Sequence, residues 1–172
     1  MFRCKPERNP KQVTLIMLTF VTAFIATAVL VCSVNSYKWI FELLLIIVLS
    51  AGIMAVYRYS MTEMEYEIFD GSFSVIKVVG QKRTVVCSLS LSTAIMLIPK
   101  AEYTEKLKAG QMPVINSRYN FNQNMKCKSY VYICEFNGKT IMVEFEPNEI
   151  FVRVMLEEIE RAKKNDQNPD KE

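Results

Sequence analysis

Two long apolar runs near the start of the chain, residues 13–32 and 40–57, constrain its fold more than any other feature. Each run is close to the roughly 20 residues that a helix needs to cross a hydrocarbon core about 30 Å thick. The first run contains no charged residue, and the second contains only Glu42, near its start. The link of residues 33–39 is short enough to make the two helices antiparallel neighbours. The sequence therefore predicts a two-helix transmembrane hairpin over residues 13–57.

Residues 1–12 form a basic arm that predicts the orientation of this hairpin. Basic residues that flank a span stay on the cytoplasmic side of the membrane. The arm has Glu7 as its one acidic residue, and the link between the runs carries only Lys38. The basic residues of the arm are Arg3, Lys5, Arg8 and Lys11. We therefore expect a multi-pass protein of the cell membrane with both termini in the cytoplasm.

A cleaved signal peptide is the alternative interpretation of the first run. Residues 26–28 read Ala-Thr-Ala, which is typical of a cleavage site. The apolar run continues to Cys32, however, beyond the roughly 7–15 residues of a signal core. We therefore expect the run to remain as a span.

Small residues recur four positions apart in both runs, which lets another helix approach closely. The pairs are Thr22 with Ala26, Ala23 with Thr27, and Ala51 with Ala55. They predict either packing of the two spans on each other or a homodimer through the spans. An ionisable residue within a span is a functional candidate, but Glu42 lies close to the interface.

After Arg58 the pattern changes to the alternation of apolar and polar residues that is typical of strands. Two dipeptides that favour tight turns, Asp70-Gly71 and Asn137-Gly138, separate neighbouring strands. The predicted strands are residues 63–68, 72–79, 84–88, 93–98, 130–136 and 140–146. Together with a C-terminal helix they predict one small cytoplasmic domain over residues 58–164, which we expect to fold without the hairpin.

The predicted C-terminal helix opens at Pro147, where the fixed φ and the missing N–H of proline cost nothing. Its apolar stripe is formed by Phe151, Met155, Ile159 and Ala162, widened by Ile150 and Val154. We expect Phe151 and Met155 to plug one end of the domain. Residues 165–172 contain no apolar side chain and predict a disordered tail.

Strand hairpins closed by one amphipathic helix, with Phe-Glu-Pro-Asn-Glu at residues 145–149, resemble the PH-like domains of small uncharacterised membrane proteins of Gram-positive bacteria. The resemblance implies a membrane α-hairpin followed by an α+β domain, a PH-like antiparallel β-barrel or sandwich closed by the C-terminal helix. PH domains that bind phosphoinositides use basic residues on the first hairpin loop. Here that loop is Asp70-Gly71, with three glutamates on the preceding strand. We therefore expect no phosphoinositide site.

Residues 100–126 form a long polar stretch in which only a short helix at 103–109 and a weak strand at 113–119 are expected. Basic residues outnumber acidic ones from residue 100 to 128, and three aromatic residues lie among them. The stretch is either a solvated loop or a surface that contacts anionic lipid. The residues expected to contact the membrane surface are Lys100, Lys106, Lys108 and Arg118.

The composition argues against most catalytic and metal chemistry. The chain has no histidine, the commonest general base and zinc ligand. Its five cysteines form no CxxC pair, and we expect reduced, mostly buried thiols, a reactive or metal-binding thiol being the alternative. Glu63, Glu65 and Glu67 would be spaced about 6.6 Å apart along a strand, too far to chelate a metal alone. We therefore expect no enzyme, no catalytic residue, no cofactor and no metal.

These observations predict a non-enzymatic module that binds a protein or peptide, or acts as a scaffold, at the cytoplasmic face of the membrane. Sensing of anionic lipid through residues 100–128 is one alternative, and an accessory subunit of a membrane transport complex is the other. The expected partners are the lipid bilayer, a protein that the sequence does not identify, and a second copy through the spans. The net charge of +3 gives no reason to expect nucleic acid.

Overall fold

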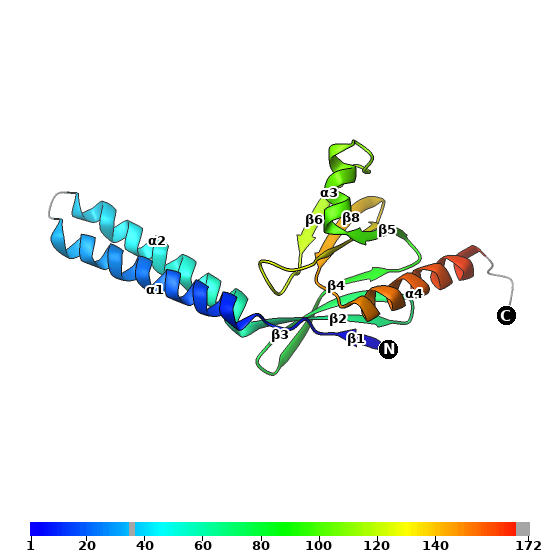
Figure 1. Cartoon of the computed structure of the whole chain (residues 1–172), viewed down its shortest axis with the longest axis horizontal. Coiled ribbons are helices and arrows are strands. Elements are labelled where there is room, and N and C mark those ends of the chain that lie inside the picture. The colour runs from blue at the N-terminus through cyan, green and yellow to red at the C-terminus, as the bar shows by residue number, and fades with distance from the viewer. Residues whose placement is uncertain (35–36, 168–172) are drawn as a thin grey trace. The chain divides into compact units, whose positions relative to one another are not determined.

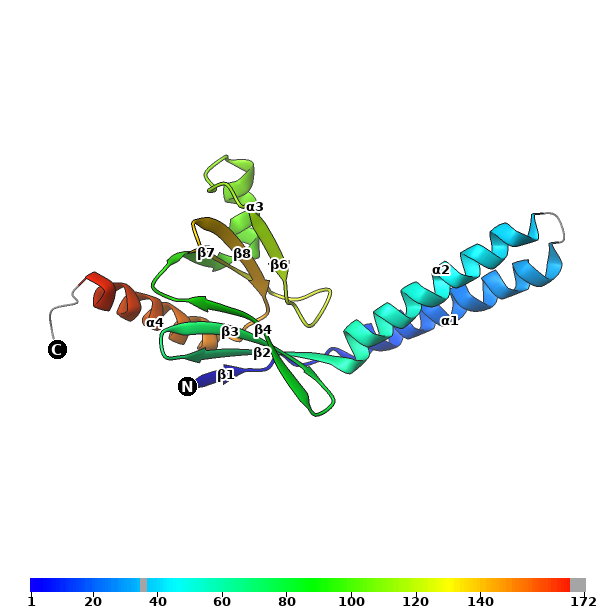
Figure 2. The same ribbon diagram turned by 180° about the vertical axis from the view of Figure 1, so that it is seen from behind.

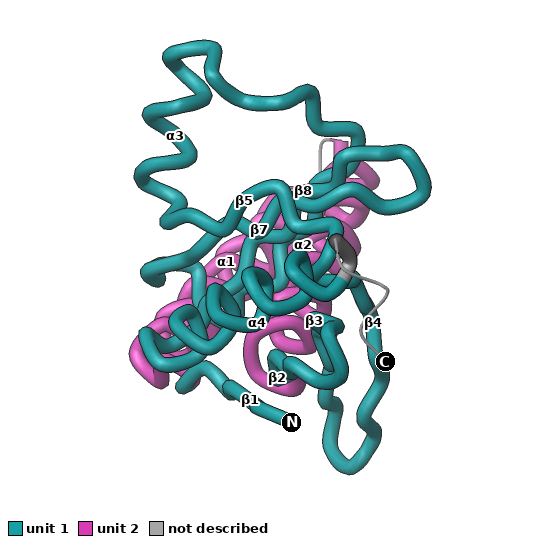
Figure 3. The backbone as a smooth tube through the Cα atoms, turned by 90° about the vertical axis from the view of Figure 1, so that its right-hand side faces the viewer, with its two compact units in different colours: residues 1–7, 63–172 teal, residues 8–62 magenta. Residues whose placement is uncertain are grey.

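A computed structural model describes residues 1–34 and 37–167. The chain forms two compact units, one of residues 8–62 and one of residues 1–7 together with residues 63–172 (Figure 3). The first unit is the helical hairpin. The second unit is the domain that contains all the strands.

The hairpin consists of α1 (Pro10–Ser33) and α2 (Lys38–Val56), and a π-helix, η1 (Tyr57–Met61), extends α2. The segments Pro10–Ser33 and Lys38–Met61 are each long and apolar enough to cross a membrane. Asn9 caps α1, because its side-chain oxygen accepts hydrogen bonds from the backbone N–H groups of the first turn. Residues 35 and 36 of the predicted link lie outside the described residues.

Within the hairpin, α1 and α2 pack together through Gly52, which is buried. A Cβ atom at this position would lie 1.8 Å from the ring of Phe20, so only glycine allows this approach. Thr27 is the buried residue of α1, whereas Thr22 and Ala26 are exposed. Packing of the spans on each other therefore uses Gly52 and Thr27, and the homodimer face stays a prediction.

The second unit contains two four-stranded sheets (Figures 1 and 2). The first sheet has the order β1-β2-β3-β4 and the second has the order β5-β7-β8-β6. The strands are β1 (Phe2–Cys4), β2 (Thr62–Phe69), β3 (Ser72–Val79), β4 (Lys82–Ser90), β5 (Ala94–Pro99), β6 (Ser117–Asn120), β7 (Tyr130–Phe136) and β8 (Lys139–Phe145). The domain is thus a pair of sheets followed by a C-terminal helix, where an antiparallel β-barrel or sandwich closed by that helix was expected. The sheets are not joined into a barrel among the described residues, and β6 pairs with β8 in parallel.

The main core lies between the inner faces of the two sheets and α4 (Glu149–Gln167). Phe151 and Met155 are fully buried in it, as the helical pattern predicts, but Ile150 is 63% exposed and Val152 is buried in its place. The helix begins after Asn148, whose side-chain oxygen accepts a hydrogen bond of 2.7 Å from the Phe151 N–H. Pro147 therefore precedes the helix and is not its first residue. The helix also continues three residues into the predicted tail, of which residues 168–172 lie outside the described part.

The N-terminal strand β1 was not foreseen from the sequence. It pairs antiparallel with β2, with Phe2 opposite Ile68 and Cys4 opposite Tyr66. Cys4 is buried, and the ring of Phe2 lies 5.9 Å from that of Phe151. The start of the chain therefore completes the domain, and the helical hairpin is inserted between two neighbouring strands of one sheet.

A second, smaller core lies on the outer face of the second sheet. Here α3 (Lys100–Lys108) contacts β5 and β7, and Tyr103 packs with Val131, Ile133 and Met142. The predicted helix thus begins three residues earlier than expected and is a packed element. β7 has apolar side chains on both faces because one face packs in the main core and the other in the smaller core.

Candidate functional site

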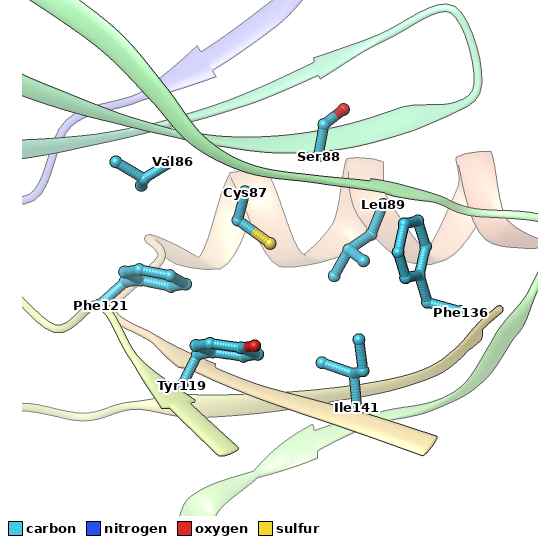
Figure 4. Close-up of a pocket in the computed structure, with 8 residues that line it drawn as sticks. All are labelled: Val86, Cys87, Ser88, Leu89, Tyr119, Phe121, Phe136 and Ile141. Carbon is cyan, nitrogen blue, oxygen red and sulfur yellow. The ribbon is translucent and has the colours of Figure 1, made fainter. Parts of the chain in front are cut away.

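The domain has a half-open apolar pocket of about 230 Å³ between β4 and the inner face of the second sheet (Figure 4). From β4 the pocket is lined by Val86, Cys87, Ser88 and Leu89, and from the second sheet by Tyr119, Phe121, Phe136 and Ile141. In Figure 4 the side chains of Cys87 and Leu89 point into the pocket toward Tyr119 and Ile141, and that of Ser88 points away. The Ser88 hydroxyl bonds instead to the Ser74 hydroxyl at 3.0 Å.

One wall of this pocket is a free strand edge. Within the described part of the chain, β4 is the last strand of its sheet and pairs with β3 on one side only. The register with β3 shifts at Val86, which makes that residue the extra residue of a β-bulge. Val85 and Val86 are 60% and 41% exposed. A long edge strand with exposed branched residues is a template for pairing with another chain.

The opposite edge of the same sheet is covered. β1 pairs with residues 66–68 of β2, and the side chain of Gln123 accepts a hydrogen bond of 2.8 Å from the Met64 N–H. Proteins commonly block edge strands in this way. The fold therefore protects β2 and leaves the longer edge of β4 open beside the pocket.

The second wall is mainly aromatic. The rings of Tyr119 and Phe121 are stacked, with centroids 6.1 Å apart and planes within 4° of parallel. Tyr119 and Phe136 are each 45% exposed. Large side chains that are exposed yet held by a sheet are well suited to bind apolar groups at low entropic cost.

Burial affects the pKa of four of the five thiols. Burial raises the pKa of the Cys87 thiol in the pocket, and it raises the pKa of Cys134 to about 11. For Cys127, burial and the nearby Glu146 carboxylate raise the pKa to about 12. Burial likewise raises the pKa of Cys4. These four thiols are protonated at neutral pH, whereas a reactive cysteine needs thiolate character.

The four basic residues predicted to contact a membrane surface do not form one patch of unpaired charge. The Lys100 ammonium lies 2.6 Å from a Glu144 carboxylate oxygen, and that of Lys106 lies 2.8 Å from Glu102. Lys108, at the end of α3, and Arg118, on β6, are exposed. Contact of these residues with lipid stays a prediction, with two of the four cations already in ion pairs.

Glu144 is the centre of a buried polar cluster that ties residues 100–129 to β8. Lys100 and Asn122 each donate to its Oε1 atom at 2.6 Å, and the Ser129 hydroxyl donates to the same atom at 3.0 Å. Burial alone would raise the pKa of this carboxyl, but the three hydrogen bonds outweigh burial and lower it. The role of this cluster is therefore structural: it anchors residues 100–129 to β8.

The row of glutamates on β2 is also neutralised within the domain. Glu63 pairs with Lys5 and Glu67 with Arg3, each at 2.6 Å, and Glu65 pairs with Arg83 of β4. Within the described residues, no three acidic, cysteine or histidine side chains are grouped to hold a metal ion. The acidic row serves to bind β1 and β4 to β2.

The sequence contained part of the signal for the pocket. Adjacent Val85 and Val86 break the alternation that a half-buried strand should show, and Tyr119 and Phe121 alternate within an otherwise polar stretch. Their proximity depends on how the two sheets cross, which no local pattern specifies.

Comparison with known proteins identifies one family. The model of the family described as "Bacterial PH-like domain (DUF6106)" matches residues 5–164. No curated protein and no solved structure matches the chain.

Proposed function

The chain belongs to the bacterial PH-like domain family, and we propose that it is a non-enzymatic, membrane-anchored module that binds a segment of a partner protein. One observation carries the proposal: the free edge of β4 borders an apolar pocket, while the other edge of its sheet is covered. Edge strands beside pockets bind extended peptides by strand addition.

The helical hairpin supplies the anchor in this proposal. Its two helices have the length and composition of spans, and their apolar side chains are mostly exposed. β1 leads into α1, β2 follows the hairpin, and the two strands pair. Two crossings therefore return the chain to the side on which it started, so the N-terminus and the domain share one side of the membrane. The basic arm favours the cytoplasmic side.

Sensing of anionic lipid through residues 100–128 is the weaker candidate. Part of this segment is packed, since Tyr103, Asn122, Gln123 and Asn124 are buried. Its excess of positive charge is reduced by the ion pairs of Lys100 and Lys106. An accessory role in a transport complex is compatible with the binding module, since such a complex would supply the partner.

Site-specific photocrosslinking in intact cells tests the proposal. A photoreactive residue replaces Val85 on the β4 edge, and a matched probe replaces Ile150, which is equally exposed on α4. We expect a discrete crosslinked partner from residue 85 and none from residue 150. Phe136→Ser, at the pocket rim, should abolish the product. Identical products from both positions, or a product from residue 85 that Phe136→Ser leaves unchanged, would overturn the proposal.

A further inference from the structure

We infer that the segment bound at this site is an extended peptide that adds to the free edge of β4, places one large apolar side chain in the pocket, and carries acidic residues on its flanks. The inference rests on the proposed function and specifies the chemistry of the partner.

The backbone of β4 favours an extended occupant. Its outer N–H and C=O groups lack a neighbouring strand among the described residues, and a chain can satisfy them in series only in the β conformation. The bulge at Val86 turns the strand at the position where it borders the pocket. Successive side chains of an added strand alternate in direction, so one side chain enters the pocket while its neighbours point away.

The size of the pocket favours a side chain over a small metabolite. Its volume of about 230 Å³ lies below the roughly 300–1,000 Å³ of typical small-molecule sites. The lining offers aromatic and aliphatic groups, and the Cys87 thiol is protonated. One phenylalanine, leucine or methionine side chain suits this volume and this surface.

The charges on the strands that line the pocket favour an acidic peptide. β4 and β6 contain Lys82, Arg83 and Arg118 and no acidic residue. Lys139 is exposed and lies opposite Phe136 of the pocket rim on the neighbouring strand. The acidic residue next to Phe136 is Glu135. Arg83 is in an ion pair with Glu65. Of these charged residues, Lys82, Arg118 and Lys139 are then exposed cations, and Glu135 is the one exposed carboxylate. Acidic flanks on the peptide would complement this excess.

The test uses the full-length protein in nanodiscs of phosphatidylcholine, which carry no net charge, and a fluorescein-labelled peptide of sequence EEVTFTVEE. Fluorescence anisotropy measures its binding. We expect at least tenfold weaker binding when the central phenylalanine becomes serine, and at least tenfold weaker binding when lysine replaces the four glutamates. Phe136→Ser in the protein should weaken binding to the same extent. Leu156→Ser, which changes an exposed apolar residue of α4, should have no effect.

Two N-methylated versions of the peptide test strand addition directly. One carries N-methyl groups at odd positions and the other at even positions, so each keeps every side chain and loses the N–H donors of one edge. Only one edge of the peptide can face β4, so one version should bind like the parent and the other at least tenfold more weakly. Equal binding of both versions would overturn strand addition.

The remaining outcomes separate this inference from the proposed function. If residue 85 crosslinks a partner in cells but no peptide binds, the partner presents a folded surface, and the inference fails while the binding function stands. If the peptide is inert and a crosslink forms between two copies of this chain through residue 85, the occupant of β4 is a second copy, which also overturns the inference. Pulse proteolysis of each variant verifies that it is folded.

Discussion

At the scale of single residues, Phe151 holds the main core together. Its ring lies 5.9 Å from Phe2, 6.3 Å from Tyr66 and Phe145, and 6.4 Å from Phe73. These partners come from β1, β2, β3 and β8, so one side chain on α4 contacts both sheets. The helix and the sheets therefore depend on each other at this position.

Phe151→Ala should lower the free energy of unfolding of the domain by about 3–5 kcal/mol, because it empties the centre of the aromatic cluster. Arg153→Ala, on the exposed face of the same helix, should change it by less than about 0.5 kcal/mol. Pulse proteolysis of the full-length protein in urea measures both. Equal losses would contradict the assigned faces of α4.

Glu144 makes stability depend on pH in the acid range. Its pKa is lower in the folded protein, so its contribution is complete above the unfolded pKa and is lost as pH falls through the folded pKa. Glu144→Gln should cost about 1–3 kcal/mol at pH 7 and flatten the loss of stability below pH 4.5. Glu102→Gln, in an exposed ion pair with Lys106, should cost less than about 1 kcal/mol. Unchanged acid sensitivity in Glu144→Gln would contradict this role.

At the scale of elements, β1 contributes more than its three residues suggest. It buries Cys4, adds Phe2 to the aromatic cluster and supplies Arg3 to Glu67 of β2, and Lys5, the residue after the strand, pairs with Glu63. The double substitution Phe2→Ser, Cys4→Ser should therefore destabilise the domain by about 2–3 kcal/mol, mainly through lost apolar burial. Arg3→Gln should cost at most about 1 kcal/mol, because the pair is partly exposed. Hydrogen exchange at residues 66–68 should rise only in the double variant; protection equal to that of the parent would show that β1 does not pair stably.

The hairpin depends on the close contact between Gly52 and Phe20. Gly52→Ala places a methyl group where the ring now lies, and overpacking of this kind costs about 1–3 kcal/mol. Phe20→Ala should relieve the clash, so the double variant should be more stable than Gly52→Ala alone. Thermal unfolding of the helices in detergent measures this coupling. Additive losses would show that the two residues do not touch.

The sequence predicted most elements because their patterns are local. The Asp70-Gly71 turn and the apolar, branched residues after it located β3 with its observed bounds, alternation located β7 with its observed bounds, and the apolar stripe located α4. β1 was missed because three residues within the basic arm are too few to show an alternating pattern, and the burial of β1 depends on β2 and α4. The crossing of the two sheets, and with it the pocket, results from long-range packing that alternation does not encode.

At the scale of the whole molecule, the main core of the unit formed by residues 1–7 and 63–172 contains, among the described residues, no side chain of the two helices. β1 and β2 are antiparallel neighbours, so a short turn can join them as an ordinary hairpin. A version in which Gly-Ser-Gly-Ser replaces residues 8–62 should be soluble and unfold cooperatively, with the marginal stability of a small domain, about 5–15 kcal/mol.

The matched control for this shortened chain is a fragment of residues 60–164, which lacks β1. It should be less stable by about 2–3 kcal/mol and prone to associate through the uncovered edge of β2. Circular dichroism and urea titration compare the two. Equal stability would show that β1 is dispensable, and an insoluble shortened chain would show that the domain needs the helices.

The pairing of β1 with β2 also fixes an order of events during synthesis. Arg3 leaves the ribosome 64 residues before its partner Glu67, a delay of several seconds at about 5–20 residues per second. In the proposed anchored protein both helices are synthesised and inserted during this interval, and β1 has no partner strand until β2 is synthesised. A chain whose N-terminus had been translocated could never bring Phe2 and Cys4 to β2, and its domain would lack the strand that seals it. In the proposed anchored protein, the first sheet can therefore be completed only when both ends of the hairpin lie on the same side of the membrane.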